Sequence, residues 1–310
     1  MIQQAAVVGA GVMGHGIAQA YAQANIPVVL YDLEETYLAK AKQAIEANLT
    51  LQMQQEMLSE EAGKSALARI VYTTELKEAV QHADMITEAI PEVIELKWEL
   101  YEKLECMAKP EAVIASNTST LPISKLAEKM RTPERMIITH FFNPAQLIPL
   151  VEVVRHARTA EEVVTFTMEV MQAIGKQPVL LKKEVPGFIA NRLQAAVVRE
   201  AFHLLEEGVA EARDIDLAVT AGPGFRWAFI GPIETADFGG LDTWKRVIDN
   251  LAPELGQSKQ ASDLINERVT AGELGAKTGR GIYTYEEVSV ADKIKERDKK
   301  FIELVKVKQG

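Results

Sequence analysis

Short apolar runs alternate with longer segments of helical periodicity over the first half of the chain. Runs with the length and residue types of buried strands lie at residues 2–8, 27–32, 69–72, 84–90, 111–116, 135–140, 149–154 and 177–181. Helical patterns separate most of these runs, and the longest, over 34–67, should break near Ser59, where SEEA (59–62) can start a new helix. Strands that alternate with helices predict a parallel, doubly wound α/β sheet.

The second half of the chain has a different pattern. Pro186 precedes a long amphipathic helix that extends to about Glu207, and Gly208 is placed as its C-terminal stop. Further helical patterns cover residues 211–221, 231–251, 258–271 and 288–310. No further strand is predicted. The sequence therefore predicts two domains, with the sheet in residues 1–185 and an all-α domain in 186–310.

Composition and charge narrow the classes of function. Of the 310 residues, 47% are hydrophobic and 25% are charged, which is ordinary for a globular protein. The formal net charge of −10 disfavours DNA, RNA and anionic membranes as partners. Glycines interrupt the first apolar run, and no segment reaches about 18 uninterrupted apolar residues, so neither a signal peptide nor a membrane helix is predicted. We expect a cytoplasmic protein that acts on a small molecule.

The chain contains one cysteine, Cys106, which excludes an intrachain disulfide and argues against a cysteine-based zinc site. Cys106 follows Leu104 in a helical pattern, and we interpret it as a small core residue. No metal site is predicted.

The glycines near the N-terminus have the spacing of a dinucleotide-binding loop. In VVGAGVMGHGIA (7–18), the glycines at positions 9, 11 and 14 follow a predicted strand and open a predicted helix. Such glycines allow a tight turn and the close approach of a pyrophosphate to a helix N-terminus. The residues predicted to line this part of the cofactor site are Gly9, Gly11, Val12, Met13 and Gly14.

Asp32 indicates which dinucleotide binds. It lies at the end of the second predicted strand, 18 positions after Gly14 (32 − 14 = 18), where a carboxylate accepts hydrogen bonds from the adenosine ribose hydroxyls. A 2′-phosphate would meet Asp32, Glu34 and Glu35 with no arginine nearby. We therefore predict NAD rather than NADP. A glycine-rich turn without a ligand is the alternative, which the surrounding strand, helix and carboxylate make the weaker interpretation.

Polar side chains also stand at or near the ends of later strands. SNTST (116–120) contains Asn117 and Ser119, and His140 ends another apolar run, with Glu152 twelve positions later (152 − 140 = 12) on the next run. Open α/β sheets bind ligands at the carboxyl ends of their strands. Each feature has a structural alternative, because SNTST can cap the following helix and a histidine at a strand end is usually a hydrogen-bonded structural residue. The functional hypothesis is a base, His140, oriented by the Glu152 carboxylate.

Several motifs, in order along nearly the whole chain, resemble the L-3-hydroxyacyl-CoA dehydrogenase family. The matching pieces are VVGAGVMGHGIA (7–18), ASNTSTLPI (115–123), HFFNP (140–144), VPGFIANRL (185–193), a degraded GLD (240–242) and KTGRGIYTY (277–285). The resemblance implies a nicotinamide-binding Rossmann domain and a helical C-terminal domain that usually forms a homodimer. It also implies NAD-dependent oxidation of the C3 hydroxyl of a 3-hydroxyacyl-CoA, such as 3-hydroxybutyryl-CoA, to the keto form.

The resemblance implies roles for single residues as well. His140 matches the family's general base and Glu152 its partner. Ser119 matches the serine near the substrate hydroxyl, and Asn191 matches the asparagine near the substrate carbonyl. The residues that match positions around the nicotinamide ribose and carboxamide are Glu92, Lys97, Asn117 and Asn143. A neutral imidazole suits the proton that leaves the alcohol, and a hydrogen-bonded carboxylate stabilises the imidazolium and holds its tautomer.

Two segments depart from the family pattern and bear on the substrate. In acyl-CoA family members the helical hairpin after the second strand usually carries lysines suited to CoA phosphates, whereas LTLQMQQEMLSEE (49–61) holds glutamines and acids. The segment 221–242 is longer than in those members. It is similar to relatives that oxidise free 3-hydroxy acids, such as L-gulonate dehydrogenase of the lambda-crystallin group or carnitine dehydrogenase. Arg226 within it is a candidate for binding a substrate carboxylate, and packing of FRWAF (225–229) at an interface is the alternative.

A non-enzymatic function is the last alternative. Lambda-crystallin-like relatives serve as bulk structural proteins, and a nucleotide sensor could bind NAD without turnover. Such a protein has no reason to keep the matched base, its carboxylate partner and both substrate-contact residues together. We therefore predict an enzyme.

Overall fold

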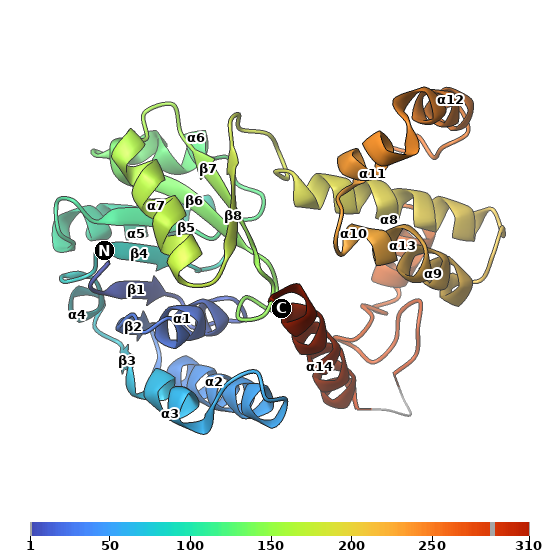
Figure 1. The fold of residues 1–310 in the computed structure, drawn as a ribbon. Helices are drawn as coiled ribbons and strands as arrows, with labels where there is room; N and C mark the ends of the chain where they lie inside the picture. The colour runs from blue at the N-terminus through green and yellow to red at the C-terminus, as the bar shows by residue number, and fades with distance from the viewer. Residues whose placement is uncertain (1, 286–288, 310) are drawn as a thin grey trace. The chain divides into compact units, whose positions relative to one another are not determined.

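Figure 1 shows a computed structural model of the chain, which describes residues 2–285 and 289–309. The chain forms two compact units. The first consists of Met1–Ile189 together with Asp298–Gly310, and the second is Ala190–Arg297. The sequence-based division into 1–185 and 186–310 stays a prediction about domains, and the compact units differ from it because the end of the chain belongs to the first unit.

An eight-stranded sheet forms the centre of the first unit, in the order β3-β2-β1-β4-β5-β6-β7-β8. The strands are β1 Ala5–Val8, β2 Val28–Tyr31, β3 Ile70–Thr73, β4 Met85–Glu88, β5 Val113–Ser116, β6 Met136–Phe141, β7 Leu150–Arg155 and β8 Gln177–Leu181. The order of the first six is that of dinucleotide-binding sheets, so the predicted Rossmann-type fold is confirmed. In this sheet β6 and β7 pair antiparallel and the other neighbouring strands pair parallel, so the sheet is mostly parallel, as predicted. A short connection joins these two strands, and short connections suit antiparallel neighbours.

Helices cover both faces of the sheet. The helices of the first unit are α1 Gly14–Gln23, α2 Glu35–Gln54, α3 Glu60–Ala68, α4 Leu76–Val80, α5 Ile94–Met107, α6 Ile123–Leu126 and α7 Glu161–Ala173, with short 3-10 turns at Ala127–Lys129 and Pro133–Arg135. Successive side chains of a strand point to opposite faces. Ala5 and Val7 of β1 therefore pack into one core with α1, α2 and α7, while Ala6 and Val8 pack into another with α4, α5 and α6.

Two local predictions in this unit have opposite outcomes. The predicted break near Ser59 is confirmed, because the Ser59 hydroxyl oxygen accepts a hydrogen bond from the Ala62 N–H at 3.2 Å and caps α3. The prediction that Cys106 is a core residue was wrong, since its side chain is exposed on α5. The buried face of α5 includes Leu100 and Leu104, and a residue two positions after Leu104 points away from that face.

The described residues of the second unit form helices and, apart from isolated bridges at Gly275, Arg280 and Thr284, no strand, so the predicted helical C-terminal region is confirmed. Its helices are α8 Ala190–Glu206, α9 Ala212–Ala221, α10 Pro223–Trp227, α11 Pro232–Gly239, α12 Leu241–Leu251 and α13 Asp263–Thr270, and α14 Val290–Gln309 begins in it. The helical pattern predicted over 231–251 forms two helices, α11 and α12. Gly240, with φ of 86°, separates α11 from α12, because a residue with this backbone conformation ends a right-handed helix.

The second unit leaves many large apolar side chains exposed. They include Phe225, Phe229, Ile233, Phe238 and Leu241. Apolar surface of this kind is typical of a face that a partner covers. The predicted homodimer stays a prediction.

The end of α14 packs within the first unit. Ile302 is fully buried in a small apolar cluster with Leu51 of α2 and with Leu147. The Lys306 ammonium donates a hydrogen bond to the backbone carbonyl of Gln55, just beyond the last turn of α2, where positive charge is favoured. The last part of α14 therefore lies against the hairpin that α2 and α3 form.

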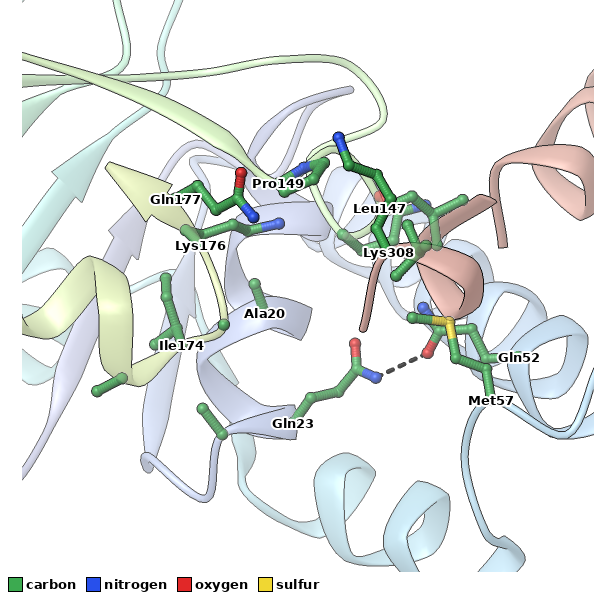
Figure 2. A pocket seen from close by; sticks show the side chains of 15 residues that line it. Ala20, Gln23, Gln52, Met57, Leu147, Pro149, Ile174, Lys176, Gln177 and Lys308 are labelled. Carbon is green, nitrogen blue, oxygen red and sulfur yellow. Dashed lines mark hydrogen bonds between the residues drawn. The ribbon is translucent and has the colours of Figure 1, made fainter. Parts of the chain in front are cut away.

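A cavity of about 320 Å³ lies in the first unit, between residues of α1, α2, α7 and α14 (Figure 2). The Gln23 amide donates to Gln52 on one side of it, at 2.7 Å. On the other side the Lys176 ammonium donates to the carbonyls of Ala145 and Ile148, at 2.5 and 2.9 Å, and burial lowers the pKa of Lys176 to about 8. None of the predicted site residues lines this cavity. Lys176 thus holds the connection between β6 and β7.

Two absences among the described residues bear on membranes and metals. No helix within residues 2–285 and 289–309 is long and apolar enough to cross a bilayer. In the same ranges, no group of three or more His, Cys, Asp or Glu side chains is arranged to hold a metal ion. The cytoplasmic location stays a prediction.

Candidate active site

The glycine loop joins the carboxyl end of β1 to α1. Gly9 has φ of 105°, and a Cβ atom at Gly14 would lie 1.7 Å from the Gly9 carbonyl oxygen. The strand and the helix approach this closely only because both positions are glycine. Gly11 differs, since a Cβ atom there would meet nothing within 4 Å. Val12 is 70% exposed and Met13 is the N-cap residue of α1, so the loop presents open space at a helix N-terminus, as a pyrophosphate requires.

Asp32 borders this loop from the end of β2. One carboxylate oxygen accepts a hydrogen bond from the Ala10 N–H at 2.7 Å, and the other accepts one from the Leu33 N–H at 2.7 Å. Glu34 and Glu35 follow and are exposed. The negative charge that was predicted to oppose a 2′-phosphate is therefore held beside the glycine loop.

We expect Asp32→Ala to narrow the preference for NADH over NADPH, because the variant lacks the carboxylate that a 2′-phosphate would meet. Two like charges about 4 Å apart near a protein surface repel by about 1–4 kcal/mol, so the ratio of the two dissociation constants should fall about tenfold or more. Fluorescence titration with both nucleotides measures it. Asp84→Ala, at the other end of the parallel strands, is the control and should keep the wild-type ratio. Equal affinity of the wild-type protein for both nucleotides would contradict the role of Asp32.

His140 and Glu152 lie directly opposite each other on the antiparallel strands β6 and β7. His140 Nδ1 is 2.9 Å from one Glu152 carboxylate oxygen, and the other oxygen accepts a hydrogen bond from the Ile189 N–H at 2.8 Å. The two side chains are 6% and 1% exposed. A carboxylate can only accept, so the proton in this bond belongs to Nδ1, and Nε2 of the neutral ring keeps its lone pair for another proton. The pair thus has the tautomer that a general base needs.

Aromatic rings flank the imidazole. The ring centroids of Phe142 and Phe188 lie 4.5 and 5.4 Å from that of His140. A protonated imidazole is costly in such apolar surroundings unless an anion accompanies it. Glu152 supplies that anion at hydrogen-bonding distance.

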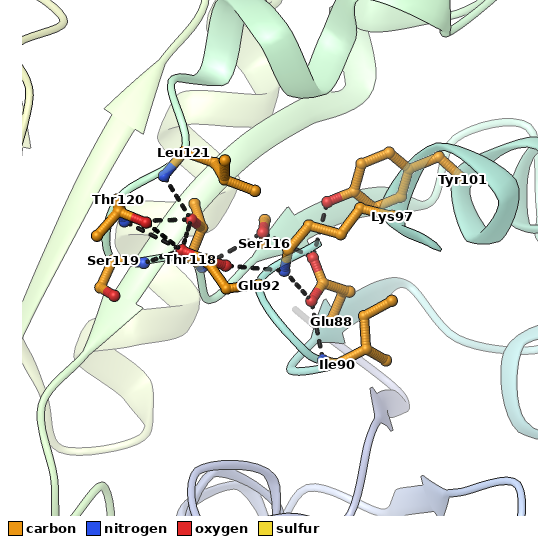
Figure 3. Close-up of polar contacts among 10 residues, drawn as sticks. All are labelled: Glu88, Ile90, Glu92, Lys97, Tyr101, Ser116, Thr118, Ser119, Thr120 and Leu121. Carbon is orange, nitrogen blue, oxygen red and sulfur yellow. Dashed lines mark hydrogen bonds and ion pairs between the residues drawn. The ribbon is translucent and has the colours of Figure 1, made fainter. Parts of the chain in front are cut away.

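Glu92 holds the SNTST segment (Figure 3). One of its carboxylate oxygens accepts hydrogen bonds from the Thr118 hydroxyl, from the N–H groups of Ser119 and Thr120 at 3.1 Å each, and from the Thr120 hydroxyl at 2.9 Å. Burial raises the pKa of Glu92, but the hydrogen bonds from Thr118 and Thr120 and the nearby Lys97 charge outweigh it, so the pKa lies below its ordinary value. An ionised carboxylate therefore fixes the loop that carries Ser119. The capping alternative is not what the structure shows, because α6 begins without a side-chain cap.

Asn117 ties the same loop to the strand of His140. Its side-chain oxygen accepts a hydrogen bond from the Phe141 N–H at 2.9 Å, and its own N–H donates to the Glu88 carbonyl at 2.8 Å. The ends of β4, β5 and β6 are thus joined, which places the loop beside the strand that ends in the predicted base.

Lys97 is buried, with 1% of its side chain exposed. Its ammonium lies 2.5 Å from a carboxylate oxygen of Glu88 and 3.3 Å from one of Glu92. The predicted contacts of Glu92 and Lys97 with the nicotinamide ribose and carboxamide stay predictions. In this structure Lys97 forms ion pairs with Glu88 and Glu92, and Glu92 also accepts hydrogen bonds from residues 118–120. Glu88 was missed by the sequence analysis, and the available signal was an acidic residue inside the apolar run DMITEAI (84–90).

The remaining predicted residues are divided between the units. Asn143 is exposed in the segment after β6. Asn191 lies on α8 and Arg226 on α10, both in the second unit. Arg226 is exposed, and no ion pair to it is found among the described residues. The roles of these residues stay predictions.

Family models match both halves of the chain. The model of the 3-hydroxyacyl-CoA dehydrogenase NAD binding domain matches residues 4–185, and the model of the C-terminal domain of the same family matches residues 187–285. The chain belongs to the 3-hydroxyacyl-CoA dehydrogenase family. It is an NAD-dependent oxidoreductase that acts on CH–OH groups, and the predicted family, cofactor and enzymatic nature are confirmed.

Relatives within the 3-hydroxyacyl-CoA dehydrogenase family differ in how much of the chain they match. The probable 3-hydroxybutyryl-CoA dehydrogenase of Bacillus subtilis is 37% identical, over 92% of this chain and 98% of its own length. A crystal structure of (S)-3-hydroxybutyryl-CoA dehydrogenase from Ralstonia eutropha, 36% identical, covers 92% of this chain and 99% of its own with a TM-score of 0.76.

A further relative matches the whole chain. The 5-formyl-3-hydroxy-2-methylpyridine 4-carboxylate 5-dehydrogenase of Mesorhizobium japonicum is 32% identical, over 100% of this chain and 99% of its own. A crystal structure of a 5-dehydrogenase for the same compound, described as an NAD⁺-dependent dismutase, is 32% identical, covers 100% of this chain and 99% of its own, and has a TM-score of 0.93. The names of the first two relatives include CoA, and the name of the pyridine carboxylate dehydrogenase does not.

Proposed function

We propose that the protein oxidises the C3 hydroxyl group of a 3-hydroxyacyl substrate to the 3-keto form, with His140 as the general base. The buried pair of His140 and Glu152, 2.9 Å apart, is the observation that supports this proposal. NAD bound at the glycine loop supplies the hydride acceptor. As the hydride leaves C3, the hydroxyl proton passes to Nε2 of His140, and the Glu152 carboxylate stabilises the imidazolium that forms.

Ser119 is proposed to contact the substrate hydroxyl. Its backbone N–H is held by Glu92, whereas its side-chain oxygen points away from the Glu92 carboxylate in Figure 3. A hydroxyl on a fixed backbone can accept or donate a hydrogen bond without a large loss of conformational freedom. Asn191 of the second unit is proposed to contact the substrate carbonyl, on the family resemblance alone.

A 3-hydroxyacyl-CoA, similar to 3-hydroxybutyryl-CoA, is the substrate that the family supports. The supporting relatives are the 3-hydroxybutyryl-CoA dehydrogenases, which are 36–38% identical to this chain. The reacting carbon of such a substrate carries a secondary alcohol, which matches the proton chemistry proposed for His140.

A free 3-hydroxy acid is the second candidate substrate, and the end of α14 is the observation that favours it. That segment lies against the α2–α3 hairpin, where the family pattern leads one to expect lysines for CoA phosphates. It also lies beyond residue 285, where the second family model ends, but within the match to the pyridine carboxylate dehydrogenase. In this alternative the exposed Arg226 binds the substrate carboxylate.

We expect Arg226→Met to separate the two candidates. A charge-assisted contact to a carboxylate contributes about 1.5–3 kcal/mol, so kcat/KM for a free 3-hydroxy acid should fall about 10- to 100-fold if Arg226 binds it. Activity on the CoA ester should change little. The measurement compares acetoacetate with acetoacetyl-CoA, each reduced with NADH, and adds gulonate, carnitine and 3-hydroxybutyrate in the oxidative direction. Arg246→Met is the control, because Arg246 pairs with Asp242 on the exposed face of α12.

The outcomes are exclusive. Efficient turnover of acetoacetyl-CoA by the wild type, with no effect of Arg226→Met, supports the CoA ester and rejects the free acid. Turnover of free acids that Arg226→Met removes and Arg246→Met does not, without turnover of any CoA ester, rejects the CoA ester.

A further inference from the structure

A fully buried carboxylate lies beneath the SNTST loop. Glu88, at the end of β4, is 0% exposed. One of its oxygens accepts hydrogen bonds from the Ile90 N–H at 2.9 Å and the Lys97 ammonium at 2.5 Å, and the other accepts them from the Tyr101 and Ser116 hydroxyls at 2.7 Å each (Figure 3). Burying a carboxylate is costly, and this set of donors offsets the cost. Burial and the Glu88 charge raise the pKa of Tyr101 well above its ordinary value, so Tyr101 is a neutral donor.

Lys97 connects Glu88 with Glu92. Its ammonium is 2.5 Å from Glu88 and 3.3 Å from Glu92, so the nearer and fully buried carboxylate is its main partner. Glu92, with 35% of its side chain exposed, uses its other oxygen for the hydrogen bonds to residues 118–120. The two carboxylates share one ammonium, so one negative charge in the group is not neutralised by it. Glu92 directs that charge to the hydrogen-bond donors of residues 118–120.

We propose that Glu88 is a positioning residue for the reaction. By holding the Lys97 ammonium at its own carboxylate, Glu88 leaves Glu92 free to bind the loop that carries Ser119. Without the Glu88 charge, a buried ammonium would draw the Glu92 carboxylate toward itself, because Glu92 is the other anion within 4 Å of it among the described residues. The hydrogen bonds to the Ser119 and Thr120 N–H groups would lengthen. This inference rests on the proposed function, in which Ser119 contacts the substrate.

The test is Glu88→Gln alone and combined with Ser119→Ala. Glutamine keeps the shape and lacks the charge. Since a displacement of about 1 Å can lower a rate about 100-fold, we expect Glu88→Gln to reduce kcat about 10- to 100-fold. The kcat is calculated from the concentration of NADH-binding sites, so that unfolded protein does not enter it. In the Ser119→Ala background the same change should cost about twofold or less, because residues that act through one another are not additive. If Glu88 had a merely structural role, Glu88→Gln would lower the amount of folded protein. Its fold-effect on kcat would then be the same in the wild-type and Ser119→Ala backgrounds.

Asp84→Asn is the matched control. Asp84 precedes β4 at its opposite end, and its carboxylate binds Lys109 at 2.7 Å and the Gln3 N–H at 2.6 Å. The variant removes a paired carboxylate charge just before the same strand and should keep the wild-type kcat. If Glu88→Gln does not yield folded protein, Glu88→Asp, which withdraws the carboxylate from Lys97 and keeps its charge, is measured in the same cycle.

The result also separates this inference from the proposed function. If His140→Gln keeps wild-type turnover, the proposed function is wrong. If His140→Gln abolishes turnover, while the Glu88 variant keeps the wild-type kcat or has the same effect with and without Ser119, the role of Glu88 alone is rejected.

Discussion

Replacing His140 by glutamine is expected to lower kcat by about 10²–10⁴-fold, the usual cost of losing a general base. Glutamine fills similar space and keeps a hydrogen-bonding group beside Glu152, but it cannot take the proton of the substrate hydroxyl. The dissociation constant for NADH should stay close to that of the wild type, because Gly9, Gly14 and Asp32 are untouched. Stopped-flow turnover and fluorescence titration with NADH measure the two quantities.

Glu152→Gln should impair turnover for a related reason. An amide nitrogen facing His140 Nδ1 would donate to it, which favours the tautomer with the proton on Nε2 and removes the base, and the imidazolium would lose its counter-ion. The control is His82→Gln, which changes an exposed histidine of the same unit and should leave both rate and binding unchanged. Near wild-type kcat for His140→Gln would show that another group accepts the proton.

Gly14→Ala is expected to impair folding, whereas Gly11→Ala is expected to impair NADH binding. At Gly14 the new Cβ atom would lie 1.7 Å from the Gly9 carbonyl oxygen, so strand and helix must separate. Overpacking of this kind costs about 1–3 kcal/mol and occasionally more, and a backbone contact this short belongs at the upper end. Gly14→Ala should therefore lower the unfolding temperature strongly or prevent folding.

At Gly11 the new Cβ atom would meet no protein atom within 4 Å, so the unfolding temperature without cofactor should stay close to that of the wild type. NADH affinity should still fall about tenfold or more, because the second glycine of such a loop lets the pyrophosphate approach the backbone. Thermal unfolding and NADH titration of both variants separate the two effects. Gly231→Ala, another position where a Cβ atom meets nothing within 4 Å, is the control. Unchanged NADH affinity of Gly11→Ala would place the pyrophosphate elsewhere.

The features that the sequence predicted correctly are those with a local physical cause. The alternation of buried strands and amphipathic helices follows from the periods of the two structures, 2 and 3.6 residues. Gly9 and Gly14 are required by a local turn and a close contact, and Ser59 caps α3 through a bond three residues along the chain. Each of these features depends on residues that are close in sequence, so it can be predicted from the sequence alone.

His140 and Glu152 are an intermediate case. Their position on consecutive apolar runs indicated that they are close, but not the direction of the second strand. The antiparallel pairing of β6 and β7 puts the two side chains directly opposite each other, at 2.9 Å. That direction follows from the short connection between the strands and from the packing that holds it, including the two hydrogen bonds from Lys176.

Only the tertiary structure decided which charged groups from different segments neutralise one another. Glu88 and Lys97 are nine positions apart and lie on a strand and a helix. Their pairing exists only once β4 and α5 pack together and exclude water from both side chains. The burial of Ile302 against α2 and the exposure of Cys106 likewise depend on which faces the assembled elements leave open. The physical reason is the same in each case. A periodic pattern acts over a few residues of one segment, whereas desolvation and charge pairing act between segments and exist only once those segments are packed.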